Sequence, residues 1–126
     1  MVTLEDVRRI GLSLPETTAD EDGVGVRNGE KVRGFAWRWK ERVDPKKGRV
    51  PNPNVLAVRT PGLEEKELLI QSEPSKFFTE AHYNNYPAVL VRLAEIDADE
   101  LEELLIDGWR CLAPKAVVKR FDASRP

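Results

Sequence analysis

The single histidine, His82, and the single cysteine, Cys111, are the residues of this chain best suited to catalysis. A histidine can act as a general base, either alone or by activating a thiol as a nucleophile. The same two residues also fit a structural interpretation, in which Cys111 packs as a small apolar side chain and His82 caps a turn. We favour the structural interpretation, because an enzyme site normally gathers several polar groups and the sequence offers only these two. No residue is therefore predicted to be catalytic, and the chain is not expected to be an enzyme.

Metal and phosphate sites leave recognisable spacings, and the sequence contains neither kind. A zinc site needs three or four Cys, His or carboxylate ligands at workable spacing. The stretch Gly23-Val24-Gly25 lacks the further glycine and the Lys-Ser/Thr pair of a phosphate-binding loop. The sequence therefore predicts no metal ion and no cofactor.

Basic residues concentrate between Arg27 and Arg59. This segment holds ten cations and three anions, so it carries a charge of +7, whereas the whole chain carries −2. Such a surface suits an anionic partner, although the wet face of an ordinary strand pair has the same composition. The predicted nucleic-acid-binding residues are Arg33, Arg38, Lys40, Arg42, Lys46, Lys47 and Arg49.

A second candidate site lies in the segment 81–87, which combines one His, two Tyr, two Asn and one Pro. A loop of this composition can hold a small polar ligand. It can also be a shaped connection whose side chains satisfy backbone groups. The residues of this alternative ligand site are His82, Tyr83, Asn84 and Tyr86.

The elements that position these residues follow from hydrophobic periodicity and turn signals. Helical spacing predicts helices over 4–12, 63–72 and 98–112, with Thr3 and Asp97 as N-caps, and Pro114 opens a last helix. Alternation predicts strands over 31–43, 55–60 and 86–93, with a loop over 44–54. Asn28-Gly29 predicts a type I′ hairpin turn. The segment 17–25 reads as a short strand or loop, and 73–78 as a short helical turn.

The strand over 31–43 shows two contrasting faces. Phe35, Trp37, Trp39 and Val43 alternate with Ala36, Arg38, Lys40 and Arg42. This pattern predicts an antiparallel sheet whose aromatic face packs into the core while its basic face meets water. Trp109, on the apolar stripe of the helix over 98–112, is expected to join that core.

Length and composition complete the outline. The 126 residues fit a single domain over 1–126, and the 40% of apolar residues suffice for a core. One cysteine and no apparent signal peptide favour the reducing cytoplasm. No apolar run approaches the roughly 20 residues that a membrane span requires, so no membrane partner is expected.

Several motifs occur in order along almost the whole chain. They are Thr3–Arg8, Leu14-Pro15-Glu16, Pro74–Phe78, His82-Tyr83, Tyr86–Leu93, Trp109-Arg110 and Ala113-Pro114-Lys115. Together these motifs resemble the MmcQ/YjbR-like family of small bacterial proteins. The resemblance implies a CyaY-like α+β fold, an antiparallel sheet with helices packed on one side. It also implies DNA binding through a "double wing" of two hairpins. The sequence departs from the family at Gly23–Gly25 and in the length of the 44–54 segment.

Two functional hypotheses follow from the residues and the resemblance. In the first, the chain is a non-enzymatic DNA-binding protein whose basic hairpins contact phosphates. In the second, it binds a protein or a small molecule through the sheet face or the His82–Pro87 loop and has no nucleic-acid role. A pI near 5.5 argues against the first. The chain is expected to be a monomer or a weak dimer.

Overall fold

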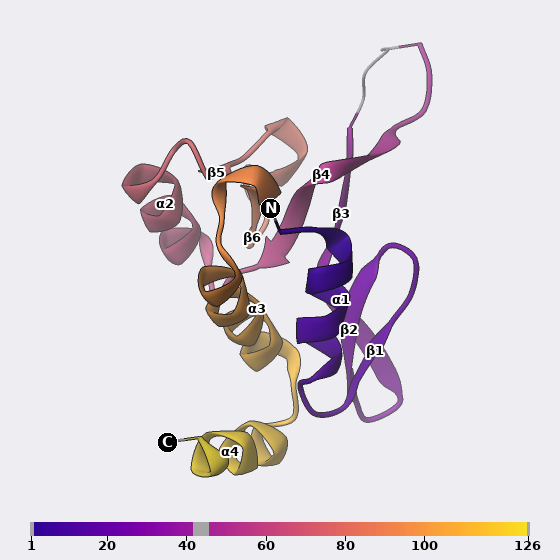
Figure 1. Ribbon diagram of the computed structural model, residues 1–126, viewed down its shortest axis with the longest axis vertical. Coiled ribbons are helices and arrows are strands. Elements are labelled where there is room, and N and C mark those ends of the chain that lie inside the picture. Colours follow the sequence, from indigo (N-terminus) through magenta and orange to yellow (C-terminus); the bar gives the residue numbers. More distant parts are fainter. Residues whose placement is uncertain (1, 42–45, 126) are drawn as a thin grey trace.

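The computed structural model describes residues 2–41 and 46–125, which form an α+β fold with helices on one side of an open sheet (Figure 1). The elements follow the order α1 (Leu4–Leu12), β1 (Thr17–Ala19), β2 (Gly23–Asn28), β3 (Lys31–Glu41), β4 (Val50–Arg59), α2 (Leu63–Ser72), β5 (Phe77–Phe78), the 3-10 helix η1 (Ala81–Tyr83), β6 (Ala88–Arg92), the 3-10 helix η2 (Leu93–Glu95), α3 (Ala98–Leu112) and α4 (Lys115–Ser124). The sheet order is β1-β2-β3-β4-β6-β5, and every pairing is antiparallel. The predicted fold class is confirmed.

The helices begin where local sequence signals place them. The Asp97 side chain accepts a hydrogen bond from the Glu100 N–H at 2.8 Å, which caps α3. At α1 the Asp6 carboxylate reaches back to the Thr3 N–H at 2.9 Å. Both predicted caps are confirmed, because each depends only on residues three positions apart.

The main core lies between the sheet and the helices. It joins buried residues of α1, α3 and the start of α4 to one face of the sheet, and α2 and α4 add partly buried side chains at its margins. Trp109 is fully buried there, as predicted, and packs edge-on against Phe121 of α4 with ring centroids 4.9 Å apart.

A β-bulge in β3 overturns the predicted division of its faces. Gly25 pairs with Gly34 and Val24 with Ala36, so Phe35 is an extra residue without a partner on β2. Phe35 and Ala36 both join the main core and are both fully buried. Beyond the bulge the alternation is inverted. Trp37 and Trp39 pack on the face away from the main core, in a cluster with Val55, Ala57 and Leu90.

The first hairpin turn differs from the prediction by one position. Asn28 pairs with Lys31, so the two central residues are Gly29 and Glu30. Gly29 has a φ of 67°, whereas Glu30 is not among the residues with positive φ. A positive φ at the first central residue alone fits a type II′ turn, not the predicted type I′.

Two other element predictions need correction. β4 begins at Val50 and includes Pro51 and Pro53, where a loop was expected. The prolines are tolerated because the β3–β4 register shifts there, between the partners of Arg38 and Lys40. Residues 77–78 form strand β5 against β6 and not a helical turn, since Phe77 and Phe78 pair with Val91 and Leu90.

Gly23 pairs with Trp37 beside the bulge, where β2 and β3 approach so closely that a side chain has no room. A Cβ at Gly23 would lie 2.1 Å from the Ala36 carbonyl oxygen and 2.7 Å from the Trp37 Cα. Because backbone would have to move, we expect Gly23→Ala to cost about 2–4 kcal/mol of unfolding free energy in urea.

Gly34→Ala is the matched control on the same face of the sheet. Its Cβ would meet nothing closer than the Trp37 ring at 3.7 Å. We expect it to change the unfolding free energy by no more than about 1 kcal/mol. Equal losses in the two variants would contradict the bulge geometry.

Candidate functional site

The face of the sheet that the helices leave open carries a cluster of aromatic side chains. Trp37, Trp39, Phe78 and Tyr83 pack over the small hydrophobic cluster of β4 and β6. Trp39 and Phe78 meet edge-on with ring centroids 5.8 Å apart, and the Arg92 guanidinium lies 4.1 Å from the Phe78 centroid. Trp37 and Trp39, which the sequence analysis assigned to the core, therefore line this open face.

A pocket of about 520 Å³ beside Trp37 brings the two predicted sites together. Its lining consists of Asp22, Trp37, Arg38, Lys40, Arg49, His82 and Tyr83. Three of the predicted nucleic-acid-binding cations thus share one pocket with two residues of the predicted ligand loop. Trp37, which no site prediction included, connects them.

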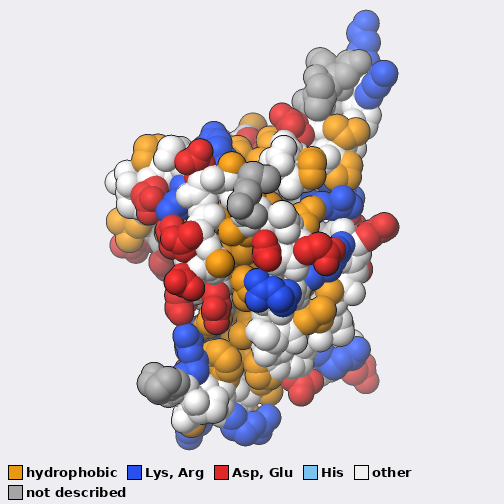
Figure 2. Space-filling view, viewed as in Figure 1, with side chains coloured by type: hydrophobic (Ala, Val, Ile, Leu, Met, Phe, Trp, Pro, Cys, Tyr) orange, Lys and Arg blue, Asp and Glu red, His pale blue; other side chains and the backbone are white. Residues whose placement is uncertain are grey.

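The other described residues of the two predictions do not line this pocket. Arg33 is exposed in the β2–β3 hairpin, paired with Val26. Lys46 and Lys47 are exposed near the tip of the β3–β4 hairpin, Asn84 and Tyr86 are exposed after η1, and Arg42 falls outside the described residues. Figure 2 shows Lys and Arg side chains at the end of the hairpin that projects from the body of the molecule.

The Trp37 ring is held in place by the ligand loop. Its Nε1–H donates to the Tyr83 hydroxyl at 3.1 Å. Tyr86 meets both rings edge-on, with centroids 6.4 Å from Trp37 and 6.1 Å from Tyr83, and remains 45% exposed. The three rings therefore form one rigid aromatic surface, of which Tyr86 gives the outer edge.

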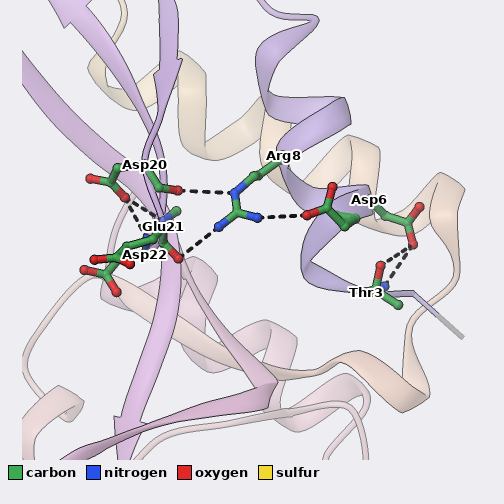
Figure 3. Close-up of polar contacts among 8 residues, drawn as sticks. Thr3, Asp6, Arg8, Asp20, Glu21 and Asp22 are labelled. Atoms are coloured by element: carbon green, nitrogen blue, oxygen red, sulfur yellow. Dashed lines mark hydrogen bonds and ion pairs between the residues drawn. The ribbon is translucent and has the colours of Figure 1, made fainter.

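The acidic turn at 20–22, which contributes Asp22 to the pocket lining, is held in place from α1 (Figure 3). Arg8 donates to the backbone oxygens of Asp20 at 3.2 Å and Glu21 at 3.0 Å, and its third bond goes to Glu5 at 2.9 Å. The Asp20 carboxylate accepts the N–H groups of Asp22 and Gly23, which closes the turn.

Asp22 in turn orients a pocket cation. Its backbone oxygen accepts the Arg38 N–H at 2.8 Å, and its carboxylate lies 3.2 Å from the Arg38 guanidinium. On the opposite side, Arg49 donates to the Lys40 carbonyl at 2.8 Å and lies 3.9 Å from the Glu80 carboxylate. Both arginines are therefore positioned by carboxylates and partly neutralised by them.

Among the described residues, four buried side-chain atoms make no hydrogen bond within the protein. They are the Arg38 Nε, the Trp39 indole nitrogen, the Thr79 hydroxyl and one Glu80 carboxylate oxygen. A buried polar group without a hydrogen bond lowers the stability of the fold, and Arg38 also lines the pocket.

Lys66 of α2 positions the ligand loop, a role that no sequence pattern predicted. Its side chain is only 3% exposed, and its ammonium donates to the carbonyl oxygens of Tyr83 and, at 2.9 Å, Tyr86. Burial lowers the pKa of Lys66 below its usual range. Within the exposed face of a surface helix, a lysine gives no pattern that distinguishes it from its solvated neighbours.

The structure does not bring His82 and Cys111 together. His82 lines the pocket on the open face, whereas Cys111 packs against the main core on the helical side and donates to the Asp107 carbonyl at 3.2 Å. Burial raises the pKa of the Cys111 thiol, which disfavours the nucleophilic thiolate.

Neither a metal cluster nor a membrane helix is found within residues 2–41 and 46–125. No group of three or more His, Cys, Asp or Glu side chains there is arranged to hold a metal ion. None of the helices described in those ranges is long and apolar enough to span a bilayer.

Fold and pocket together define a small α+β protein with one helix-covered and one open, aromatic sheet face. The family model described as YjbR matches residues 12–111. The chain therefore belongs to the YjbR family, and the resemblance predicted from its motifs is confirmed.

Known relatives agree with this assignment. The uncharacterised proteins Rv2570 of Mycobacterium tuberculosis and Mb2600 of Mycobacterium bovis are each 38% identical over 130 residues, which cover 98% of both chains. The crystal structure of Deinococcus radiodurans protein DR2400, of the domain family DUF419, matches with a TM-score of 0.65 and 24% identity. That match covers 97% of this chain and 89% of the other, and it supports the fold.

Replacing Lys66 by methionine tests its role in holding the ligand loop. The Met variant leaves the carbonyls of Tyr83 and Tyr86 without their donor, so we expect a loss of about 1–3 kcal/mol in unfolding free energy. Faster amide exchange in residues 83–86 should accompany it. Lys119→Met on α4, where the lysine is exposed, should change neither quantity.

The pH dependence gives a second measurement on the same variant. Because the pKa of Lys66 is lower in the folded protein, the unfolded chain binds more protons between that pKa and the ordinary value. The unfolding free energy of the native protein should therefore rise with pH through this interval. Lys66→Met should lack this rise, and an unchanged profile would show that Lys66 is not desolvated in solution.

Proposed function

We propose that this protein is a non-enzymatic nucleic-acid-binding module that uses the open face of its sheet. The supporting observation is the pocket whose lining includes Trp37 of β3 together with Arg38, Lys40 and Arg49. Proteins that bind single strands combine cations that follow the phosphates with aromatic rings on which bases stack. Cations and an aromatic ring occur together here, on β3 and just before β4.

The arrangement favours unpaired bases over an intact duplex. A ring set within a pocket can reach a base only when the base is turned out of its stack, and single-stranded nucleic acid offers such bases without an unpairing cost. Lys40 and the exposed cations near the hairpin tip, Lys46 and Lys47, are placed to follow the backbone away from the pocket. In this proposal one of the two predicted wings, the β3–β4 hairpin, contacts the phosphates beside the aromatic pocket.

The acidic overall composition does not oppose this proposal. Charges on surfaces separated by more than the Debye length, about 8 Å at physiological salt, act almost independently. Among the described residues that line the pocket, Asp22 is the single carboxylate, and it is already engaged by Arg38. Glu80, outside the lining, lies beside Arg49, so Lys40 keeps its charge unopposed by either carboxylate. A phosphate approaching Lys40 therefore meets a local excess of positive charge.

A small anionic, aromatic molecule is the second candidate ligand for the same pocket. A volume of about 520 Å³ lies within the range of roughly 300–1,000 Å³ that small-molecule sites occupy. A free nucleotide would use the same ring and cations, so the two candidates differ in whether a chain of phosphates adds affinity.

Oligonucleotide titration followed by fluorescence anisotropy tests the proposal. We expect single-stranded DNA to bind more tightly than duplex, with affinity falling as salt is raised. Each phosphate contact to a single strand contributes about 0.7 to the magnitude of the slope of log affinity against log salt. Replacing Lys40, Lys46 and Lys47 by alanine should therefore reduce that magnitude by roughly 2. Trp37→Leu should weaken binding by about 1–3 kcal/mol with the slope unchanged.

The matched control removes three exposed cations elsewhere. Lys115, Lys119 and Arg120 of α4, replaced together by alanine, change the net charge by the same amount at a distance from the pocket. This variant should retain the affinity and slope of the native protein. Absence of binding at low salt would overturn the nucleic-acid proposal, and saturation by a mononucleotide with equal affinity would favour the second candidate.

A further inference from the structure

A groove between α2 and α3, on the helical side of the molecule, is unrelated to the open-face pocket. It consists of two hollows of about 430 and 420 Å³ that share Leu69, Leu104 and Asp107. Its floor is apolar, and Leu68 at its edge is 60% exposed. Exposed apolar surface with a polar rim is characteristic of a surface that binds another protein.

The rim of this groove is acidic. Among the described residues that line it, the carboxylates are Glu65, Glu73, Asp99, Glu100, Glu103 and Asp107, and the single cation is Arg59. Figure 2 shows Asp and Glu side chains gathered over α2 and α3, with hydrophobic side chains among them. A partner must therefore bring positive charge as well as apolar surface.

Internal cations satisfy only part of this rim. Lys76 lies 2.8 Å from Glu73 and 2.5 Å from Glu100, and Arg125 lies 3.0 Å from Glu103. Within residues 2–41 and 46–125, no salt bridge neutralises Glu65, Asp99 or Asp107. Burial in the groove raises the pKa of Asp107, which indicates a carboxylate whose charge is incompletely solvated.

The complementary surface lies on this same chain, in residues 46–50, the described part of the β3–β4 hairpin tip. Lys46 and Lys47 are exposed there, and Val50, just beyond Arg49, is 49% exposed. The tip thus presents an apolar side chain next to cations, whereas the groove presents apolar side chains next to carboxylates. The hairpin projects beyond the body of the molecule and away from α2 and α3 (Figure 1), so one molecule cannot bring its own tip to its own groove.

We propose that the β3–β4 tip of one copy docks into the α2–α3 groove of a second copy, with Val50 over Leu68 and Lys46 and Lys47 against Glu65 and Asp107. The contact joins two different surfaces, the tip of one copy and the groove of another. Two copies form a closed dimer when each places its tip in the groove of the other about a two-fold axis. Otherwise the same contact adds further copies into an open chain. The rim charges are solvent-exposed, so the association is weak and decreases as salt is raised.

This inference does not depend on nucleic-acid binding, and it is tested without nucleic acid. Where both hold, phosphates and the groove compete for Lys46 and Lys47, so an oligonucleotide dissociates the assembly. Failure of either proposal leaves the other intact, because the groove contributes nothing to the open-face pocket.

Charge reversal on each surface, followed by sedimentation velocity at low and high salt, tests the docking. One variant carries Lys46→Glu and Lys47→Glu, and the other carries Glu65→Lys and Asp107→Lys. The native protein should show a sedimentation coefficient that rises with concentration at low salt and not at high salt. Each variant alone should remain monomeric, because its tip and groove then carry like charges.

Mixing the two variants provides the decisive measurement. Each tip then meets a groove of opposite charge, so an equimolar mixture should recover concentration-dependent association at low salt. The control variant, Lys115→Glu with Lys119→Glu on α4, should associate like the native protein.

Three results would overturn the proposal. They are a native protein that stays monomeric at low salt, reversal variants that still self-associate, and a mixture that remains monomeric. Circular dichroism confirms that each variant is folded, and the neutral pairs Lys46→Ser with Lys47→Ser and Glu65→Gln with Asp107→Asn replace any reversal that unfolds. Each neutral variant should self-associate more weakly than the native protein, and native-like association in both would equally overturn the proposal.

Discussion

The β-bulge at Phe35 decides which side chains of β3 meet the helices and which line the open face. Because side chains alternate along a strand, one extra residue transfers every later side chain to the opposite face. Phe35 and Ala36 therefore enter the main core together, and Trp37 and Trp39 lie on the other side of the sheet. Without this bulge the tryptophans would face the helices, and the pocket beside Trp37 would have no aromatic wall.

The helices could be predicted from the sequence because their signals are local. The Asp97 cap, the apolar stripe through Trp109 and the break at Pro114 each depend on residues within a few positions of one another. The faces of β3 could not be predicted in the same way. The extra residue exists only relative to β2, where Val24 and Gly25 are adjacent while their partners are not. The alternation of side chains within β3 does not show how β3 pairs with β2, and the bulge is a property of that pairing.

The candidate site was predicted in pieces, and its assembly was not. The cations of β3 and the aromatic loop after η1 were each recognisable by composition, yet 46 residues separate Trp37 from the Tyr83 to which it donates. The side chains that fix the site are less visible still. Lys66 and Arg8 act on backbone oxygens, and an acceptor of that kind leaves no trace in the sequence. A site held this way is pre-organised, because the loop and the acidic turn are anchored before any ligand arrives.

The division of charge follows from the same architecture. A net charge of −2 describes a chain whose 27–59 segment carries +7, and the hairpin formed by that segment projects from the body while acidic α2 and α3 lie on the helical side. Opposite charges packed side by side would form salt bridges and cancel locally. Here the distance between the hairpin tip and the α2–α3 groove preserves both potentials. Each surface therefore attracts partners of opposite charge, and the acidic pI reflects only the net charge of the whole chain.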